Sequence, residues 1–346
     1  MKKKMSAAAL WICIASAAFP LTLMSYNVEN LFDDVRNGTE YREFNPQRGW
    51  NTELFKARVE SIAEVVRKAV PGGADILLFQ EIENENALGA LVKNGLGGMG
   101  YSWSVMVPKS GLAANVALVS RVPVARVRAH AVGPWKGETP VRDVIEADVE
   151  MGGHMLYVFN DHWKSKTGGV RGSEPSRLES CAVLARRVQE ILGQDPAADI
   201  VAAGDFNENV DEYARTGRKY QTALLPAAED RGTGAFAARS IYLSPVAAGL
   251  GMVGGRLVLY EPWFETEKRG RGSYFYQGSW LTVDHILLSP GLFDSRGFVY
   301  RRGSFGPVAL DFLLAPDGAP RRWKGVDGPR GYSDHLPLLI TLDLRK

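Results

Sequence analysis

The sequence has 346 residues, few cysteines and no strong excess of either charge. Its only cysteines are Cys13 and Cys181, and it has 41 Lys and Arg residues against 39 Asp and Glu. Such a balance means that a nucleic-acid ligand would have to be held by a local basic patch and not by the overall charge. The apolar stretch near the start is too short to span a membrane as a stable helix, and no other segment reaches spanning length.

Several motifs of well-known catalytic and metal sites are also missing. The sequence has no HExxH, no pair of CxxC motifs, no GxSxG and no Walker loop. It also has no internal repeat, no low-complexity tract and no Pro/Ser-rich linker. The composition, 45% hydrophobic and 23% charged, is that of a globular protein. Alternating strand-like and helix-like segments then predict one large α/β domain.

The first 17 residues form a separate unit. Three lysines precede an apolar stretch that runs from about Ala7 to Ala15, and Ala15, Ser16 and Ala17 offer an A-x-A cleavage site. This pattern predicts a secretory signal peptide over residues 1–17 and a single catalytic domain over residues 18–346. An uncleaved membrane anchor is the alternative.

Cleavage of the signal peptide would change two counts. The Lys and Arg count falls from 41 to 38 against 39 acidic residues, so the net charge is near −1. Cys181 is then alone, which excludes an internal disulfide. We expect a secreted or periplasmic monomer without stable membrane association.

Hydrophobic periodicity places the main elements. Two amphipathic helices are predicted, at residues 55–70 and 177–193. Strands are predicted at residues 21–28, 74–84, 115–124, 142–150, 154–163, 198–209, 281–290 and 336–344. Residues 209–280 give little periodic signal.

Many of the apolar strands carry a short polar cluster at one end. The clusters include Asn27, Gln80-Glu81, Asn160-Asp161-His162, Asp205-Phe206-Asn207, Asp284-His285 and Asp334-His335. Ligands bind in the crevice at strand ends in α/β sheets, so we expect these clusters to converge. Carboxylate and amide oxygens suit Mg²⁺ or Mn²⁺ better than zinc. The chemistry predicted is metal-assisted attack of water on a phosphate ester.

Six segments occur in the order found in one family. "SYNVENLF", "LLFQEIEN", "NDHWKSK", "AAGDFNEN", "VDHILLS" and "YSDHLPL" resemble the motifs of the endonuclease/exonuclease/phosphatase (deoxyribonuclease-I-like) family, and "NDHWKSKTGG" is most similar to secreted bacterial nucleases. The resemblance covers nearly the whole chain after the leader. It implies a four-layered sandwich of two packed mixed β-sheets flanked by helices. It also implies a divalent-metal-dependent phosphodiester hydrolase that uses Mg²⁺ or Mn²⁺, with Ca²⁺ as a further option.

The resemblance implies a role for each matching residue. Glu81 would be the main metal ligand, Asn27 would touch metal or phosphate, and Asp334 would support the metal side. Asp205 would orient or deprotonate water, and Asn207 would hold the phosphate. His335, paired with Asp284, would bond phosphate oxygens, and His162 would stabilise the transition state or assist the leaving group.

Other charged and aromatic residues have two interpretations. Lys164 and Lys166 could hold flanking phosphates or be solvated, and we favour phosphate contact. The segment "KRGRGSYFYQGSW" at residues 268–280, with Arg271, suits a nucleic-acid strand as well as an ordinary loop that packs its rings inward. For His285 we favour structural packing.

A nuclease acting on DNA, or on RNA, is the leading hypothesis. A phospholipase C or sphingomyelinase-type phosphodiesterase, or another phosphatase, keeps the fold and changes the substrate. A catalytically inactive binding module is a further alternative, disfavoured because no expected site residue is missing. The sequence does not decide between endo and exo cleavage or between one and two metals.

Overall fold

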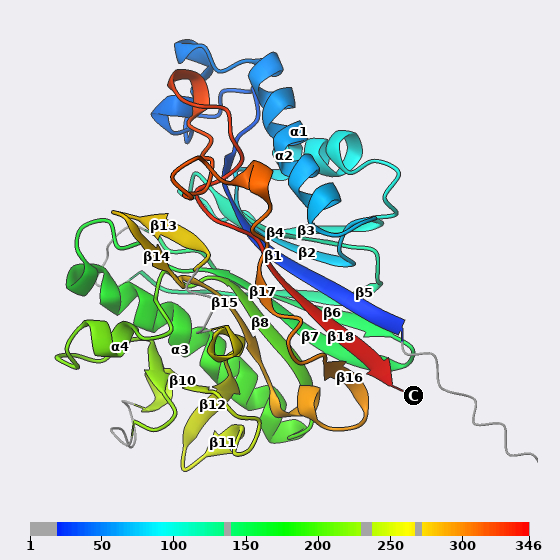
Figure 1. Cartoon of the computed structure of the whole chain (residues 1–346), viewed down its shortest axis with the longest axis vertical. Coiled ribbons are helices and arrows are strands. Elements are labelled where there is room, and N and C mark those ends of the chain that lie inside the picture. Colours follow the sequence, from blue (N-terminus) through cyan, green and yellow to red (C-terminus); the bar gives the residue numbers. More distant parts are fainter. Residues whose placement is uncertain (1–18, 135–139, 230–236, 267–271, 346) are drawn as a thin grey trace, which may run out of the picture.

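The computed structural model describes residues 19–134, 140–229, 237–266 and 272–345. The described chain contains two large mixed sheets that pack face to face, with helices on both outer faces (Figure 1). This arrangement confirms the predicted four-layered α/β sandwich. The leader, residues 1–17, lies outside the described residues. Among the described helices, none combines the length and apolar character needed to cross a bilayer.

The first sheet has seven strands in the described chain, in the order β16-β18-β1-β2-β4-β3, with β17 paired to β18. The bounds of these strands are β1 (Phe19–Leu31), β2 (Ile76–Ile82), β3 (Trp103–Met106), β4 (Asn115–Ser120), β16 (Gly297–Tyr300), β17 (Gly306–Pro307) and β18 (Leu338–Arg345). β1 runs parallel to β2 and antiparallel to β18. The carboxyl ends of β1 and β2 therefore lie beside the start of β18.

The second sheet has nine described strands, in the order β5-β6-β7-β8-β15-β12-β10-β9, with β11 paired to β12. Their bounds are β5 (Val124–His130), β6 (Val144–Met151), β7 (His154–His162), β8 (Asp199–Asp205), β9 (Leu224–Pro226), β10 (Ile241–Ser244), β11 (Gly251–Val253), β12 (Arg256–Tyr260) and β15 (Asp284–Leu288). β7 and β8 are parallel and β15 is antiparallel to β8. A separate hairpin consists of β13 (Tyr274–Tyr276) and β14 (Ser279–Leu281).

The helices cover the outer faces of the two sheets. The α-helices are α1 (Thr52–Ala69), α2 (Glu85–Ala90), α3 (Val170–Gln194) and α4 (Glu212–Arg215), and α2 continues as a π-helical turn over Leu91–Gly95. Short 3₁₀ turns lie at Arg42–Phe44, Pro46–Arg48, Ala237–Arg239, Pro262–Glu265, Pro290–Phe293, Asp311–Leu313 and Gly325–Asp327. α1 and α2 pack on the first sheet, and α3 packs on the second (Figure 1).

Both predicted helices exist, but one is longer than its periodicity indicated. α1 begins after Asn51, whose side chain accepts the backbone N–H of Leu54, and it ends before Pro71 as expected. α3 begins at Val170, seven residues before the predicted start, although it contains Pro175. The Arg177 guanidinium donates to the carbonyls of Val170 and Lys164, so tertiary hydrogen bonds hold the turn that the proline weakens.

The predicted strands are present with shifted ends. The expected strand at residues 115–124 is divided between β4 and the start of β5, which belong to different sheets. The apolar faces of both sheets form the central core, which includes Leu23, Leu78, Val201, Ile286 and Ile340. Cys181 is buried and free, and its thiol donates to the carbonyl of Ala223.

Candidate active site

The polar clusters meet at one end of the two sheets. Asp205 at the end of β8 is in register with His162 at the end of β7 and with Asp284 at the start of β15. Asn27 and Glu81 come from the neighbouring ends of β1 and β2, and Asp334 and His335 precede β18. The structure thus brings together all eight predicted catalytic and metal residues: Asn27, Glu81, His162, Asp205, Asn207, Asp284, Asp334 and His335.

Backbone conformations outside the regular strand geometry orient several of these side chains. Glu81 has a positive φ of 70° and lies where the pairing of β2 with β4 shifts register, so it is turned out of the regular pleat. Asn207, just after β8, also has a positive φ, of 53°. Gly204 has no substitute at its position, because a Cβ there would lie 1.9 Å from the carbonyl oxygen of Asp161 on the adjacent strand.

Asn27 connects the two sheets across the site. Its side-chain amide donates to Glu81 Oε1 at 3.2 Å and to Asp205 Oδ2 at 3.0 Å. The amide oxygen of the same residue accepts the backbone N–H of Glu29 at 3.0 Å. Ser333, next to Asp334, donates its hydroxyl to the Asn27 carbonyl at 2.7 Å. A single amide therefore fixes the spacing between the carboxylates of Glu81 and Asp205.

Glu81 and Asp334 form the acidic side of the site. Burial raises the pKa of Glu81, and the neighbouring charge of Asp334 raises it further. Asp334 forms an ion pair with Arg322 at 3.0 Å, and Arg322 also pairs with the buried Glu29 at 2.6 Å. Carboxylates that repel each other in a half-buried setting fit a divalent cation, and their oxygens are the donors that Mg²⁺ and Mn²⁺ prefer. The residues present therefore fit the implied metal.

A second group in the described chain also has metal-like spacing. Ligand atoms of Asp205, Asp284 and His335 all lie within 4.8 Å of one another. Within this group, however, His335 Nδ1 is already hydrogen-bonded to Asp284 Oδ2 at 2.8 Å. The hydrogen bond accounts for much of the spacing, so this group fits a metal less well than the Glu81 side does.

His335 is held as a cation. Burial alone would lower its pKa, but the charge and hydrogen bond of Asp284, followed by the charges of Asp205 and Asp334, raise the pKa well above its usual value. Its ring stacks on Tyr274 with centroids 4.6 Å apart. The free Nε2 lies 3.9 Å from both Asp205 Oδ2 and Asp334 Oδ1, so it faces the space between the carboxylates.

His162 has the opposite charge state. Burial lowers its pKa well below the usual value, and the charges of Arg142 and His335 lower it further, so its imidazole is neutral. Its Nε2 is 3.5 Å from Asp205 Oδ2 and 4.0 Å from Glu81 Oε1. Burial and the charge of Asp284 raise the pKa of Asp205 to about 7. One cationic and one neutral imidazole therefore flank a carboxyl that is ready to take up a proton.

The site opens into a cavity of about 920 Å³. At its inner end lie Glu81, His162, Asp205, Asn207, Asp334 and His335. The lining also includes Tyr274, Tyr276 and Leu281 of the β13–β14 hairpin. Lys166, Val170, Arg215, Lys219 and Tyr220, in and around α4 and the start of α3, line it as well. The cavity is large enough for several groups beyond one phosphate.

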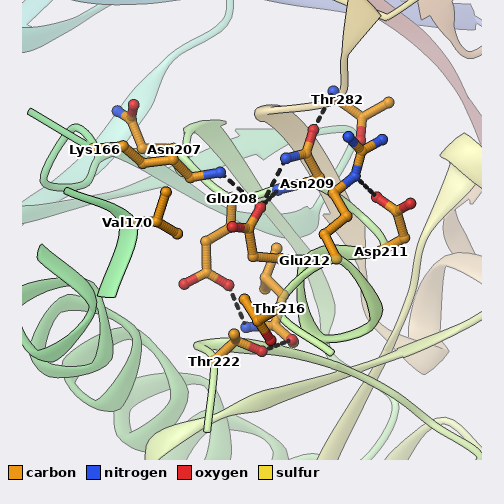
Figure 2. Close-up of polar contacts among 12 residues, drawn as sticks. Lys166, Val170, Asn207, Glu208, Asn209, Asp211, Glu212, Thr216, Thr222 and Thr282 are labelled. Carbon is orange, nitrogen blue, oxygen red and sulfur yellow. Dashed lines mark hydrogen bonds and ion pairs between the residues drawn. The ribbon is translucent and has the colours of Figure 1, made fainter. Parts of the chain in front are cut away.

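The predicted phosphate-binding cations are placed unevenly. Lys166 lies in the cavity wall, but its ammonium pairs with Glu212 at 2.6 Å, and Glu212 also accepts from Asn209 (Figure 2). Asn209 in turn accepts the backbone N–H of Thr282 (Figure 2). Lys164 is half-buried beside His162, where its charge helps to lower the pKa of the imidazole. Arg271 lies outside the described residues.

Two neighbours of the predicted residues have structural surroundings. His285 is fully buried, with Nδ1 2.5 Å from Glu261 Oε2 and Nε2 2.9 Å from the Glu208 carbonyl. It stacks on Phe206, which stacks on Trp163. The Glu208 side chain lies away from Lys166 (Figure 2). Its carboxylate accepts the backbone N–H of Leu224 at 2.9 Å. His285 thus has the packing role that we favoured.

Two arginines near the site were not among the predicted catalytic, metal or substrate-binding residues. Arg142, the first residue of a predicted strand, is close enough to lower the pKa of both Glu81 and His162. Arg322 reaches Asp334 and Glu29 from a segment 293 residues after Glu29. A charge at the edge of an apolar strand was the one available signal for Arg142, and the sequence carries none that pairs Arg322 with Glu29.

The fold and this oxygen-rich site define a class of protein, the α/β-sandwich phosphoesterases that depend on a divalent metal. The sequence model of the endonuclease/exonuclease/phosphatase family matches residues 22–230. The chain belongs to this family, and it is a metal-dependent phosphodiester hydrolase. A search of curated protein sequences finds no match.

Solved structures share the fold at low sequence identity. Truncated TDP2 from Caenorhabditis elegans aligns with a TM-score of 0.55 and 15% identity, over 94% of this chain and 98% of that one. An endonuclease/exonuclease/phosphatase family protein from Bacteroides thetaiotaomicron aligns with a TM-score of 0.54 and 18% identity, over 95% and 99%. TDP2 from D. rerio, complexed with single-strand DNA product, aligns with a TM-score of 0.51 and 15% identity, over 93% and 98%.

Proposed function

We propose that the protein is an exported nuclease that hydrolyses phosphodiesters of DNA, or of RNA, with Mg²⁺ or Mn²⁺. The convergence of Glu81, Asp205, Asp334 and the Asp284–His335 pair on one cavity carries this proposal. Similarity to the D. rerio structure complexed with single-strand DNA product favours a nucleic-acid substrate. The Lys-rich, apolar leader supports export.

Each residue would have a distinct role in the reaction. Glu81, with Asp334 and Asn27, would hold the metal, which supplies charge neutralisation at the phosphate when bound. Asp205 would accept a proton from the attacking water, and Asn207 would hold the phosphate. The water oxygen forms the new bond to phosphorus as the bond to the leaving oxygen breaks. The leaving oxygen takes a proton from solvent, and Asp205 returns its proton to solvent.

The two imidazoles would act on the charge that develops. His335 would donate Nε2–H to a non-bridging phosphate oxygen, where negative charge grows in the transition state. Asp284 would keep that proton donor charged and oriented. His162, neutral and next to Asp205, would contact the phosphate or the leaving group without adding a second fixed charge beside His335.

A lipid phosphodiesterase is the rival on the same fold. Val246, Met252 and Val253 are exposed apolar side chains around β11. This tip lies at the far end of the second sheet from the β13–β14 hairpin that borders the cavity (Figure 1). Insertion of the tip into a membrane would therefore not bring the cavity to the lipid surface, which favours the nuclease.

The deciding experiment uses the protein exported with its own leader and then purified. It is incubated with plasmid DNA, with RNA and with sphingomyelin vesicles, each with Mg²⁺ and with a chelator. We expect metal-dependent cleavage of nucleic acid. Hydrolysis of sphingomyelin alone would establish the lipid enzyme, and no hydrolysis at all would favour a binding module. N-terminal sequencing of the exported protein should begin at Ala18, and retention of Met1 in the membrane fraction would contradict cleavage.

A further inference from the structure

The β13–β14 hairpin is attached directly to the catalytic histidine. Tyr274 and His335 form an isolated antiparallel bridge, and the backbone N–H of Leu336 donates to the Ser273 carbonyl at 2.7 Å. The turn between the strands has two residues of positive φ, Gln277 at 47° and Gly278 at 79°. Two such residues give the tight hairpin turn that fits the twist of the strands. The hairpin is therefore held in a defined position beside the reaction centre.

The strand alternation of this hairpin puts two tyrosines on one face. Tyr274 and Tyr276 both line the cavity, whereas Phe275 points the other way and packs on Trp280, with ring centroids 5.2 Å apart. Tyr276 lies nearly parallel to Tyr274, at an interplanar angle of 12° and a centroid distance of 6.1 Å. Tyr274 stacks in turn on His335. A row of three rings thus leads from the reactive imidazole to solvent.

The outermost ring of this row is open to a ligand. Tyr276 is 52% exposed. Tyr274 is half-buried between Tyr276 and His335. Among the described residues, the exposed face of Tyr276 is therefore available to a planar group.

Three of the four Lys and Arg residues that line the cavity in the described part of the chain are ion-paired, and Lys219 is the fourth. Lys166 pairs with Glu212, Arg215 pairs with Asp211 at 2.5 Å, and Arg322 pairs with both Glu29 and Asp334. Cations that are already paired release few counterions when a phosphate binds. At these three paired residues, a bound nucleic acid would therefore gain little affinity from charge, and other contacts have to contribute.

We propose that Tyr274 and Tyr276 form a base-stacking subsite for a nucleotide next to the scissile phosphate, so that the enzyme prefers single-stranded nucleic acid. The inference rests on the proposed nuclease function and specifies its substrate. Stacking on an aromatic ring contributes about 1–3 kcal/mol per base and tolerates every base. A continuous duplex hides the faces of its bases, so it offers nothing to the exposed ring of Tyr276.

Three substrates of equal length test the subsite: a single-stranded thymidine 10-mer, the same strand without bases, and the duplex. The wild-type enzyme should cleave the thymidine strand with the highest kcat/KM. Tyr276→Ala should lower kcat/KM on that strand by about 5- to 150-fold, the equivalent of one lost stack. The loss should appear in KM, because the stack holds substrate and transition state alike. Cleavage of the base-free strand should not change.

Two variants serve as controls. Tyr276→Phe keeps the ring and should retain wild-type values. Trp103→Ala removes a ring of similar exposure, 41%, from β3 at the far edge of the first sheet, and should have no effect. The proposed subsite is wrong if Tyr276→Ala cleaves the thymidine strand like wild type, or if its kcat/KM falls equally on the base-free strand. The nuclease function would stand in both cases. If the wild type cleaves lipid and no oligonucleotide, both the subsite and the nuclease function are wrong.

Discussion

Glu81 owes its position to a backbone conformation that costs free energy. A non-glycine residue with φ near 70° is strained by about 1–3 kcal/mol. The strain turns the carboxylate out of β2 toward Asn27 and Asp334, where burial raises its pKa. A strained, half-buried carboxylate next to a like charge lowers the stability of the folded protein when no cation is bound. At this position function, and not stability, explains the residue.

Replacing Glu81 by glutamine should remove the metal site and leave the fold. The amide keeps the shape and the contact with Asn27, but it lacks the charge that holds a divalent ion. We expect Mg²⁺ to bind at least about 10–100-fold more weakly, the loss typical even of residues outside the ligand set. Isothermal titration with Mg²⁺ measures this, and Glu85→Gln, an exposed acid on α2, is the control. Unchanged Mg²⁺ affinity in Glu81→Gln would show that the ligands lie elsewhere.

His335 should contribute to the chemical step and little to binding. Its cationic Nε2–H would contact a phosphate oxygen on which charge grows, so His335→Ala should lower kcat by about 10²–10³-fold with little change in KM. Asp284→Asn should act in the same direction, and the double variant should lose less than the product of both effects because the pair acts as a unit. Single-turnover cleavage by the three variants is the measurement. A His335→Ala rate within about threefold of wild type, far below one lost donor, would remove His335 from the mechanism.

At the scale of elements, the close approach of β7 and β8 depends on one glycine. The two strands are parallel neighbours, and Gly204 on β8 lies opposite Asp161 on β7. Gly204 has a φ of 141°, and a Cβ at this position would lie only 1.9 Å from the Asp161 carbonyl oxygen. The two strands can approach this closely because glycine has no Cβ. The pairing of β7 with β8 places His162 beside Asp205. The contact between these two site residues therefore depends on the close approach of the two strands.

Gly204→Ala should therefore separate the two strands. Because the clash is with backbone, we expect a loss of about 3 kcal/mol or more in the free energy of unfolding, together with loss of activity. Gly193→Ala is a matched control, because Gly193 lies in α3 with open space around it and alanine should stabilise the helix by about 0.5–1 kcal/mol. Urea unfolding measures both variants. Equal stability of Gly204→Ala and wild type would mean that the strands can move apart freely.

Elements were predictable where a local pattern fixed them. α1 carries both its apolar spacing and its Asn51 cap in the sequence, so its position followed from residues alone. The first turns of α3 did not, because Gly172 and Pro175 disfavour a helix and the Arg177 hydrogen bonds that hold it come from tertiary structure. Residues 209–280 gave short strands whose pairing partners, such as β12 for β10, no local pattern encodes.

At the scale of the whole molecule, the position of the site was predictable because it depends only on which strand ends lie at the same edge of the sheets. Strand ends that share an edge bring their polar residues together, and the order of the motifs specified which strands these were. The supporting charges were not predictable, because they depend on contacts between distant segments. Arg322 with Glu29 is one case, and Arg58, which donates to the Tyr332 carbonyl, is another. A further contact between distant segments joins the two sheets to each other.

The hydrogen bond between Asp199 and Phe298 joins the two sheets, and the ionisation of Asp199 should make this contact sensitive to pH. Asp199 begins β8 in the second sheet, and its Oδ2 accepts the backbone N–H of Phe298 in β16 of the first sheet at 2.9 Å. Burial raises the pKa of Asp199 from 3.8 to about 7, although the Phe298 hydrogen bond opposes this, and the charges of Asp294 and Asp195 add to the rise. The folded protein therefore binds this proton more tightly than the unfolded chain does.

The sign of the effect follows from linkage. A raised carboxyl pKa in the folded state costs nothing below the unfolded value of 3.8, and the cost grows until the pH passes the folded value of about 7. Asp199→Asn keeps an oxygen acceptor for Phe298 and has no proton to lose. Its stability relative to wild type should rise by on the order of 2 kcal/mol between pH 5 and pH 8. Urea unfolding at both pH values gives the difference, and Asp317→Asn, an exposed aspartate that also accepts a backbone N–H, should show no such trend. Parallel pH profiles for Asp199→Asn and wild type would mean that Asp199 ionises as easily in the folded protein as in the unfolded chain.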